Sequence, residues 1–237
     1  MVRDLSVRYG VPIATDNVFL ERCPMRKRCS VLLPVAVLGL FMMGALRSRT
    51  SVCDELFEKG TAREVENAIK SGIALKTANK ESYTPLMLAA MKNSDPEVVK
   101  ILVRGGADME ARTKLGRTPL AIAAAQNPNA AVAEALIEAG ADPDALDNRG
   151  SCVLLQAIRA GRSPAVIKTL IKAGADLNVV KKNIDATPLT ALIVSDLPVS
   201  DICGLIRLMA EAGADLRFEN REKLTPLMLA LAVNSPL

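Results

Sequence analysis

From residue 51 onward, short apolar segments alternate with polar, turn-rich connections. Residues 85–92 (PLMLAAMK) are mostly apolar, a polar break follows, and residues 98–105 (VVKILVRG) are again mostly apolar. Residues 107–117 (ADMEARTKLGR) are then polar and contain no sustained apolar run. The pattern predicts two short helices followed by a hairpin-like connection.

Two phrases recur along the chain in one register. Thr-Pro-Leu occurs at 84–86, 118–120, 187–189 and 225–227, and Gly-Ala-Asp occurs at 106–108, 140–142, 174–176 and 213–215. The step from Pro85 to Pro119 is 34 residues, and so are the steps from Gly106 to Gly140 and from Gly140 to Gly174. Four copies of two separate phrases indicate an array of internal repeats.

Both phrases suit the ends of helices. Threonine is a good N-cap because its hydroxyl accepts a backbone N–H of the first turn, and proline fits the first helical position because its missing N–H costs nothing there. Glycine commonly ends a helix in the left-handed conformation. We expect the second helix of a pair to start in the same way at Asp95-Pro96, Asn127-Pro128 and Ser163-Pro164. The two phrases are therefore interpreted as structure rather than as a site.

Composition supports a stack of small units and argues against most catalytic chemistries. Of the 237 residues, 50% are hydrophobic but only 3% are aromatic, and none is tryptophan, whereas compact domains usually rely on large aromatic anchors. Histidine is absent, which removes Ser-His and Cys-His activation of a nucleophile and nearly all familiar zinc sites. Asp142, Asp144 and Asp147 cluster, but they lie in a connection with cap and turn roles. A carboxylate-based enzyme is therefore the least favoured alternative, and no cofactor or metal is expected.

The net charge of +4 comes from the start of the chain. The first 50 residues hold eight Lys/Arg and three Asp/Glu, whereas residues 51–237 hold 22 and 23. Because the repeat region is close to neutral, a general nucleic-acid role loses its main electrostatic support.

The repeated phrases resemble the ankyrin repeat, whose period is close to this one and whose mark is a Thr-Pro-Leu-His-type phrase. The resemblance covers about residues 51–237. It implies a mainly α ankyrin-repeat solenoid of stacked helix-turn-helix units, joined by β-hairpin-like loops, that binds another protein. The units are expected at 51–78 (an N-terminal cap), 79–112, 113–146, 147–181, 182–219 and 220–237 (partial).

The chain departs from the family pattern in four ways. The family's histidine, which supports hydrogen bonds near the helix start, is replaced by Met87, Ala121, Leu155, Thr190 and Met228. Residues 151–154 read Ser-Cys-Val-Leu, so that inner helix lacks its proline start. Four extra residues lie around 195–201, and we place them in the loop between two helices. After residue 226 only one helix fits, so either a further repeat is missing or an apolar face meets a partner.

Residues 31–46 (VLLPVAVLGLFMMGAL) form an unbroken apolar run directly after Arg26-Lys27-Arg28. This arrangement is typical of a secretory signal peptide, whereas a spanning helix usually needs roughly 18 or more apolar residues. Residues 25–50 are therefore a predicted signal peptide or, since a good cleavage site is lacking, a retained membrane-anchor helix. With Met25 as the predicted start, residues 1–24 are a mis-assigned or disordered extension. The protein is expected to be exported: periplasmic, secreted, or anchored with its repeats outside the cytoplasm.

Three cysteines follow the leader, namely Cys53, Cys152 and Cys203. Their spacing matches no metal motif and implies no disulfide framework. We expect all three to be small buried hydrophobic residues.

The resemblance implies that hairpin tips and the exposed side of the inner helices together form a concave partner-binding face. By register, the tips contribute Lys80, Tyr83, Arg112, Lys114, Leu115, Arg117, Asn148, Arg149, Lys181, Lys182 and Arg221. The inner helices contribute Lys92, Gln126 and Arg159.

The middle tips are mainly basic, which predicts an acidic surface on the partner; the alternative is that these charges are simply solvated. Leu115 and Tyr83 are candidate apolar anchors, although Tyr83 could instead pack against the neighbouring hairpin. The favoured function is a non-catalytic protein-binding module outside the cytoplasm. The alternative is a secreted effector that acts on proteins of another cell.

Overall fold

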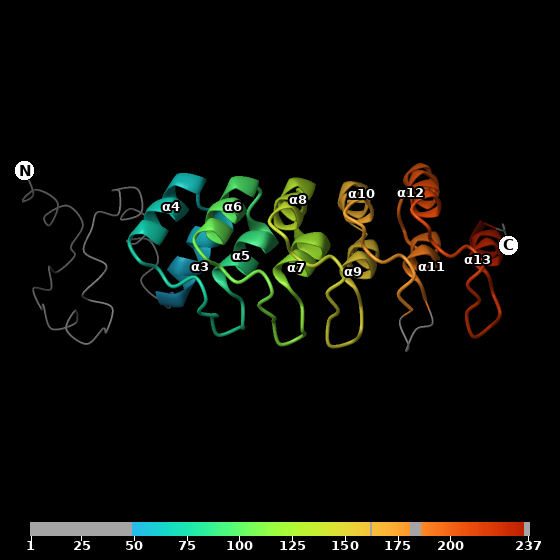
Figure 1. Cartoon of the computed structure of the whole chain (residues 1–237), viewed down its shortest axis with the longest axis horizontal. Coiled ribbons are helices and arrows are strands. Elements are labelled where there is room, and N and C mark those ends of the chain that lie inside the picture. Colours follow the sequence, from blue (N-terminus) through green and yellow to red (C-terminus); the bar gives the residue numbers. More distant parts are fainter. Residues whose placement is uncertain (1–48, 162, 181–185, 235–237) are drawn as a thin grey trace, which may run out of the picture. The chain divides into compact units, whose positions relative to one another are not determined.

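The computed structural model describes residues 49–161, 163–180 and 186–234, which form stacked pairs of helices (Figure 1). The inner helices are α3 (Arg49–Lys59), α5 (Pro85–Lys92), α7 (Pro119–Gln126), α9 (Val153–Ala160), α11 (Pro188–Ile193) and α13 (Pro226–Asn234). The outer helices are α4 (Ala62–Lys70), α6 (Pro96–Arg104), α8 (Ala130–Glu138), α10 (Pro164–Lys172) and α12 (Val199–Glu211).

Each helix packs against its equivalent in the next pair, inner on inner from α3 to α13 and outer on outer from α4 to α12. The predicted mainly α architecture of stacked helical pairs is therefore confirmed. In the described ranges there is no β-strand, and one isolated antiparallel bridge joins Leu146 and Cys152. None of the helices in these ranges is long and apolar enough to cross a membrane. The predicted leader lies outside the described residues, except for positions 49 and 50, which begin α3.

The core is a row of aliphatic side chains that repeats with the helices. In the inner helices α5, α7, α9 and α11, the residue two places after the N-cap is at most 1% exposed; these residues are Leu86, Leu120, Leu154 and Leu189. In the outer layer, fully buried residues recur in the same register as Leu102, Leu136, Leu170 and Met209. Burying such a side chain stabilises the fold by roughly 1.5–3 kcal/mol, so this row supplies much of the cohesion between pairs.

The predicted threonine caps are confirmed. Thr84, Thr118 and Thr187 each accept the backbone N–H three residues later, at 3.3 to 3.4 Å. At the unit without Thr-Pro-Leu, the sulfur of Cys152 accepts the N–H of Leu155 at 3.4 Å and so takes the place of the hydroxyl. Thr190 occupies the position of the family's histidine, and its hydroxyl accepts the N–H of Thr187 at 2.9 Å. Part of the lost hydrogen bonding is thereby restored in that unit.

The expected cap at Asn127-Pro128 is wrong. Helix α8 is capped by Asn129, whose side chain accepts the N–H of Ala131, whereas Asn127 ends α7. Asn127 is 1% exposed, and its Nδ2 donates to the carbonyls of Ala90 at 2.9 Å and Asn93 at 2.8 Å in the preceding pair. A buried asparagine at this position satisfies backbone groups that a packed loop would otherwise leave unpaired.

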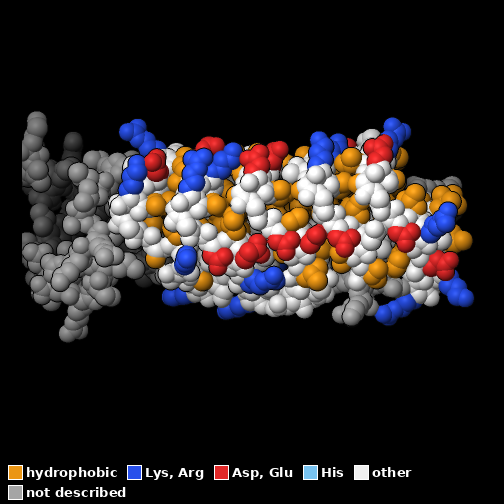
Figure 2. Space-filling view, in the orientation of Figure 1, with side chains coloured by type: hydrophobic (Ala, Val, Ile, Leu, Met, Phe, Trp, Pro, Cys, Tyr) orange, Lys and Arg blue, Asp and Glu red, His pale blue; other side chains and the backbone are white. Residues whose placement is uncertain are grey.

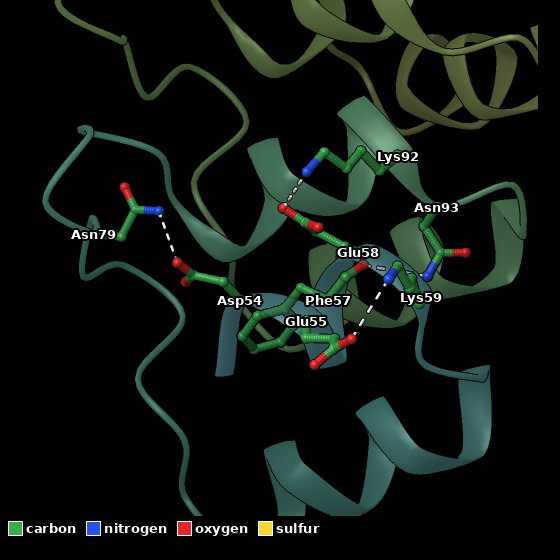
Figure 3. Close-up of polar contacts among 8 residues, drawn as sticks. All are labelled: Asp54, Glu55, Phe57, Glu58, Lys59, Asn79, Lys92 and Asn93. Carbon is green, nitrogen blue, oxygen red and sulfur yellow. Dashed lines mark hydrogen bonds and ion pairs between the residues drawn. The ribbon is translucent and has the colours of Figure 1, made fainter. Parts of the chain in front are cut away.

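Asn93 occupies the same position one repeat earlier and makes the same connection. Its Nδ2 donates to the carbonyl of Phe57 at 3.2 Å (Figure 3). It also donates to the carbonyl of Gly60 at 2.9 Å. We refer to the two side chains, Asn93 and Asn127, as the asparagine ladder. The ladder ties α3, α5 and α7 together through their C-terminal ends.

The N-terminal pair fits the prediction of two helices before the first Thr-Pro-Leu. Polar side chains tie it to the next pair: Asn79 donates to Asp54 at 3.0 Å, and Lys92 forms an ion pair with Glu58 at 2.8 Å (Figure 3). Helix α4 has a full capping box in which Thr61 and Glu64 satisfy each other's backbone N–H groups. The outer helix of this pair is therefore capped by its own residues.

The position predicted for the four extra residues is only partly right. Helix α12 has 13 residues, whereas α6, α8 and α10 have nine each, so α12 is four residues longer. Helix α11 has six residues instead of the eight of α5, α7 and α9, and the segment between α11 and α12 is longer to match. Pro198 starts α12 early because its fixed φ suits a helix start. Most of the added length is therefore helical.

Replacing Asn127 with Ala should destabilise the stack by about 2–4 kcal/mol, because buried carbonyls of the preceding pair lose their donors. Urea unfolding followed by circular dichroism measures this change. Gln126→Ala is the control: Gln126 is half-buried, and its side chain makes no hydrogen bond within the described ranges, so we expect less than about 1 kcal/mol. Equal destabilisation by the two variants would contradict a role for the ladder.

Candidate functional site

Tight loops precede four of the inner helices, and we call them fingers: residues 79–83, 113–117, 147–151 and 220–224. In every finger the N–H of the first residue donates to the carbonyl of the fifth, at 2.8 to 3.2 Å. The side chains of Asn79, Asp147 and Asn220 each accept two further backbone N–H groups of their own finger. The predicted hairpin-like connections are therefore confirmed, and each finger is closed by its own sequence.

The second and third fingers are also bonded to each other. Nη1 of Arg112 donates to the carbonyl of Leu146 at 2.7 Å and to that of Gly116 at 3.2 Å. In the opposite direction, Asn148 donates through Nδ2 to the carbonyl of Lys114 and through its backbone N–H to that of Leu115, both at 3.0 Å. Arg112 and Asn148 therefore hold the fingers in place, which accounts for two of the predicted site residues structurally.

Three predicted basic residues on the fingers are exposed and make no side-chain hydrogen bond or ion pair in the described part of the chain: Lys80, Lys114 and Arg149. They lie on successive fingers, the first, second and third. Arg221 is exposed on the last finger, and Lys181 and Lys182 lie outside the described residues. Among the described residues of the basic stripe predicted on the middle fingers, Lys114 and Arg149 are therefore available, and Lys80 adds an available charge on the first finger.

The predicted inner-helix residues have different surroundings. Lys92 is paired with Glu58, and Gln126 is half-buried at the end of α7. Arg159, at the end of α9, is exposed, and its side chain makes no hydrogen bond or ion pair with the described residues. Arg117, which is predicted at a hairpin tip rather than on an inner helix, is half-buried, and its Nε is buried with no acceptor among the described residues. Of these four, Arg159 is the most available to a ligand.

The two predicted apolar anchors also differ. Tyr83 is half-buried and packs against the hydrophobic core, which agrees with the alternative in which it supports the neighbouring elements. Leu115 is 52% exposed at the second finger, although its backbone carbonyl is bonded to Asn148. Leu115 is therefore an apolar side chain presented on a fixed backbone.

A pocket of about 590 Å³ opens beside α11, between α9 and α13. Its apolar walls include Ile158, Ala191, Val194 and Leu229, and charged side chains are contributed by Arg159 and Asp196. Sequence reasoning identified Arg159 but not Val194 or Asp196. The four extra residues around 195–201 could have indicated this pocket. A unit with altered helix lengths cannot pack on its neighbours as the other units do.

Acidic side chains occupy the turns after the outer helices, and Figure 2 shows a row of Asp and Glu running along the repeats. Several have structural roles. Glu110 accepts the N–H of Asp142 at 3.2 Å, and Asp144 accepts that of Asp176 at 2.7 Å, each across a repeat boundary. Asp147 closes the third finger. The cap and turn roles predicted for Asp142, Asp144 and Asp147 are confirmed, since Asp142 accepts the N–H of Asp144.

The cysteines follow the prediction at one position. Cys152 is 1% exposed, and burial raises the pKa of its thiol, which therefore stays protonated at neutral pH. Cys203 is exposed, so its predicted burial is wrong; it lies on the solvent side of the longer α12. The side chain of Cys53 is not among those that the structure describes, so its predicted burial stays a prediction. In the described ranges, no group of His, Cys, Asp and Glu is arranged to hold a metal ion.

A family model described as ankyrin repeats (3 copies) matches residues 41–147 and, in a second overlapping match, residues 86–181. Together the two matches extend over more than half of the 237 residues. No curated protein matches the chain.

Gly116→Ala should separate the second and third fingers. Gly116 has φ +77°, and an added Cβ would lie 2.7 Å from the backbone nitrogen of Asn148. We expect a loss of about 2–4 kcal/mol from backbone strain and overlap together.

Gly150→Ala is the matched control, because Gly150 also has a positive φ of +68° but its Cβ would meet nothing within 4 Å. It should show the strain alone, about 1–2 kcal/mol. Chemical denaturation measures both variants, and equal losses would contradict the close finger contact.

Proposed function

The chain belongs to the ankyrin repeat family, and on this basis we propose that it is a non-catalytic module that binds another protein through its fingers and inner helices. Ankyrin repeats are generally protein–protein interaction modules, and such domains are typically not catalytic. The observation that supports this surface is the presence of available side chains on fingers that are already fixed by internal hydrogen bonds. A surface ordered before binding loses less conformational entropy when a partner is bound.

Leu115 is the proposed central anchor of the fingers. Exposed apolar side chains that become buried at the centre of an interface contribute more to affinity than charges at its edge. Lys80, Lys114 and Arg149 surround it on successive fingers and complement an acidic partner surface, which would speed association and make it salt-dependent. We therefore propose that the charges speed association with the partner and that Leu115 supplies most of the binding affinity.

We also propose that the repeats act outside the cytoplasm. Support comes from the sequence alone: Arg26-Lys27-Arg28 is followed by the apolar run 31–46, as in a secretory signal peptide or anchor. The near neutrality of residues 51–237 agrees with a protein partner rather than a nucleic acid.

Leu115→Asp should weaken binding of a partner by at least about tenfold, because it places a charge where an apolar contact is expected. The full chain, carrying a tag, first captures partners from an envelope fraction, and the affinity of each partner is then measured with purified variants. Leu216→Asp is the matched control, since Leu216 is 51% exposed but lies in the turn after α12 rather than on a finger. If both variants bind as tightly as the original chain, the fingers are not the interface.

Replacing Arg26-Lys27-Arg28 with glutamates should abolish export, since a positive segment before the apolar run is needed for a signal peptide. Protease accessibility in intact cells, compared with lysed cells, reports on which side of the membrane the repeats lie. The original chain should be digested in intact cells whose outer barrier is opened, and the variant only after lysis. Protection of the original chain in those cells would refute an extracytoplasmic location.

A further inference from the structure

The asparagine ladder does not continue past α7. Asn93 and Asn127 each lie nine residues after the N-cap of their inner helix, and the residues at this distance in the next two repeats are Gly161 and Asp196. Glycine has no side chain, and an ionised aspartate has acceptors but no N–H donor. Neither residue can make the bonds to the preceding pair's carbonyls that the ladder makes, so α9 and α11 are not tied to their predecessors in this way.

The inner layer is also shorter at the same place. Because α11 ends at Ile193, the residues that follow it leave the helical path, and Val194 is 54% exposed. Gly161 ends α9 in the left-handed conformation with φ +61°, which turns the chain away from the helix axis. The pocket of about 590 Å³ lies where these two changes meet. Its volume falls in the range of roughly 300–1,000 Å³ that is typical of ligand sites.

The pocket has apolar walls and two unpaired charges of opposite sign. Ala191 and Val194 from the end of α11 and Leu229 from α13 supply accessible aliphatic surface. Arg159 and Asp196 also line the pocket, are both exposed, and make no side-chain hydrogen bond or ion pair within the described residues. The pocket can therefore bury an aliphatic group while each charge remains free to pair with a ligand.

From this arrangement we infer that the pocket binds an extended peptide segment of a protein partner, in which an aliphatic side chain lies between an acidic and a basic residue. The acidic residue pairs with Arg159 and the basic residue with Asp196, while the aliphatic side chain packs on Val194 and Leu229. This inference rests on the proposed protein-binding function and assigns it a second contact region, which reaches the last finger at Asn220 but includes no residue of the other three fingers.

Nucleic acid fits the pocket poorly. Single strands are usually held by aromatic side chains that stack on bases and by positive charges along the backbone. None of the described residues that line the pocket is aromatic, and Asp196 repels phosphate. A peptide with charges of both signs satisfies Arg159 and Asp196 together.

The test is selection of a random-peptide library against the full chain, followed by affinity measurement with purified variants. The selected peptides should be enriched in an aliphatic residue flanked by an acidic and a basic one. Val194→Arg, which fills the pocket, should weaken their binding by at least about tenfold. Val199→Arg is the matched control, because Val199 is also an exposed valine, at 67%, but does not line the pocket. It should leave the affinity unchanged.

Charge exchange tests the assigned contacts. Asp196→Lys should shift the selected peptides from a basic to an acidic residue at one flank only, and Arg159→Glu should make the opposite change at the other flank. Absence of any peptide binder, equal effects of Val194→Arg and Val199→Arg, or peptides unaffected by both charge exchanges would each overturn the pocket assignment. Peptides that lose binding with Leu115→Asp but not with Val194→Arg would overturn it as well, while leaving the proposed function of the fingers intact.

Discussion

The structure depends on burial that no helical pair achieves alone. In α11, the leucine two places after the N-cap, Leu189, is 1% exposed because helices lie on its flanks. In α13 the equivalent residue, Leu227, is 70% exposed, and Met228 and Leu231 are also more than half exposed. Both leucines belong to a Thr-Pro-Leu phrase at a helix start, so the difference comes from neighbouring pairs. Stability therefore accumulates across the interfaces between pairs, and each interface must fit the next.

Packing between successive pairs also requires that buried polar groups find hydrogen-bond partners. Packing a loop between two helical pairs removes backbone carbonyls from water, and each must then find a donor. Asn127 supplies two hydrogen bonds to the preceding pair, and the acceptor Asp144 binds an N–H of the following one. The acidic row in Figure 2 is explained in part by this requirement, since carboxylates there accept backbone N–H groups across repeat boundaries. The charge of such side chains suggests a binding site, but their hydrogen bonds hold neighbouring repeats together.

The repeat period and the helix caps could be predicted from the sequence because they depend on local chemistry. Thr84 caps α5 through bonds within a few residues, and glycine ends the outer helices where φ is positive. Roles that depend on another repeat were missed. Asn127 looks like a cap beside proline, and only the stacked structure shows its donors reaching the preceding pair. Likewise, Arg112 looks like a free charge at a hairpin tip, whereas its guanidinium donates to the carbonyl of Leu146, directly before the next finger.

The contrast between the two halves of the stack follows from one repeated position. Where it holds Asn93 or Asn127, an amide both donates to the preceding pair and accepts from its own chain, so neighbouring inner helices are joined at their C-terminal ends. Where it holds Gly161 or Asp196, the donor is missing and a pocket lies beside the helix end. A solenoid can tolerate this local loss because each pair contacts only its neighbours. A residue at this position that no longer bonds the preceding pair can consequently contribute to a binding site in its own repeat.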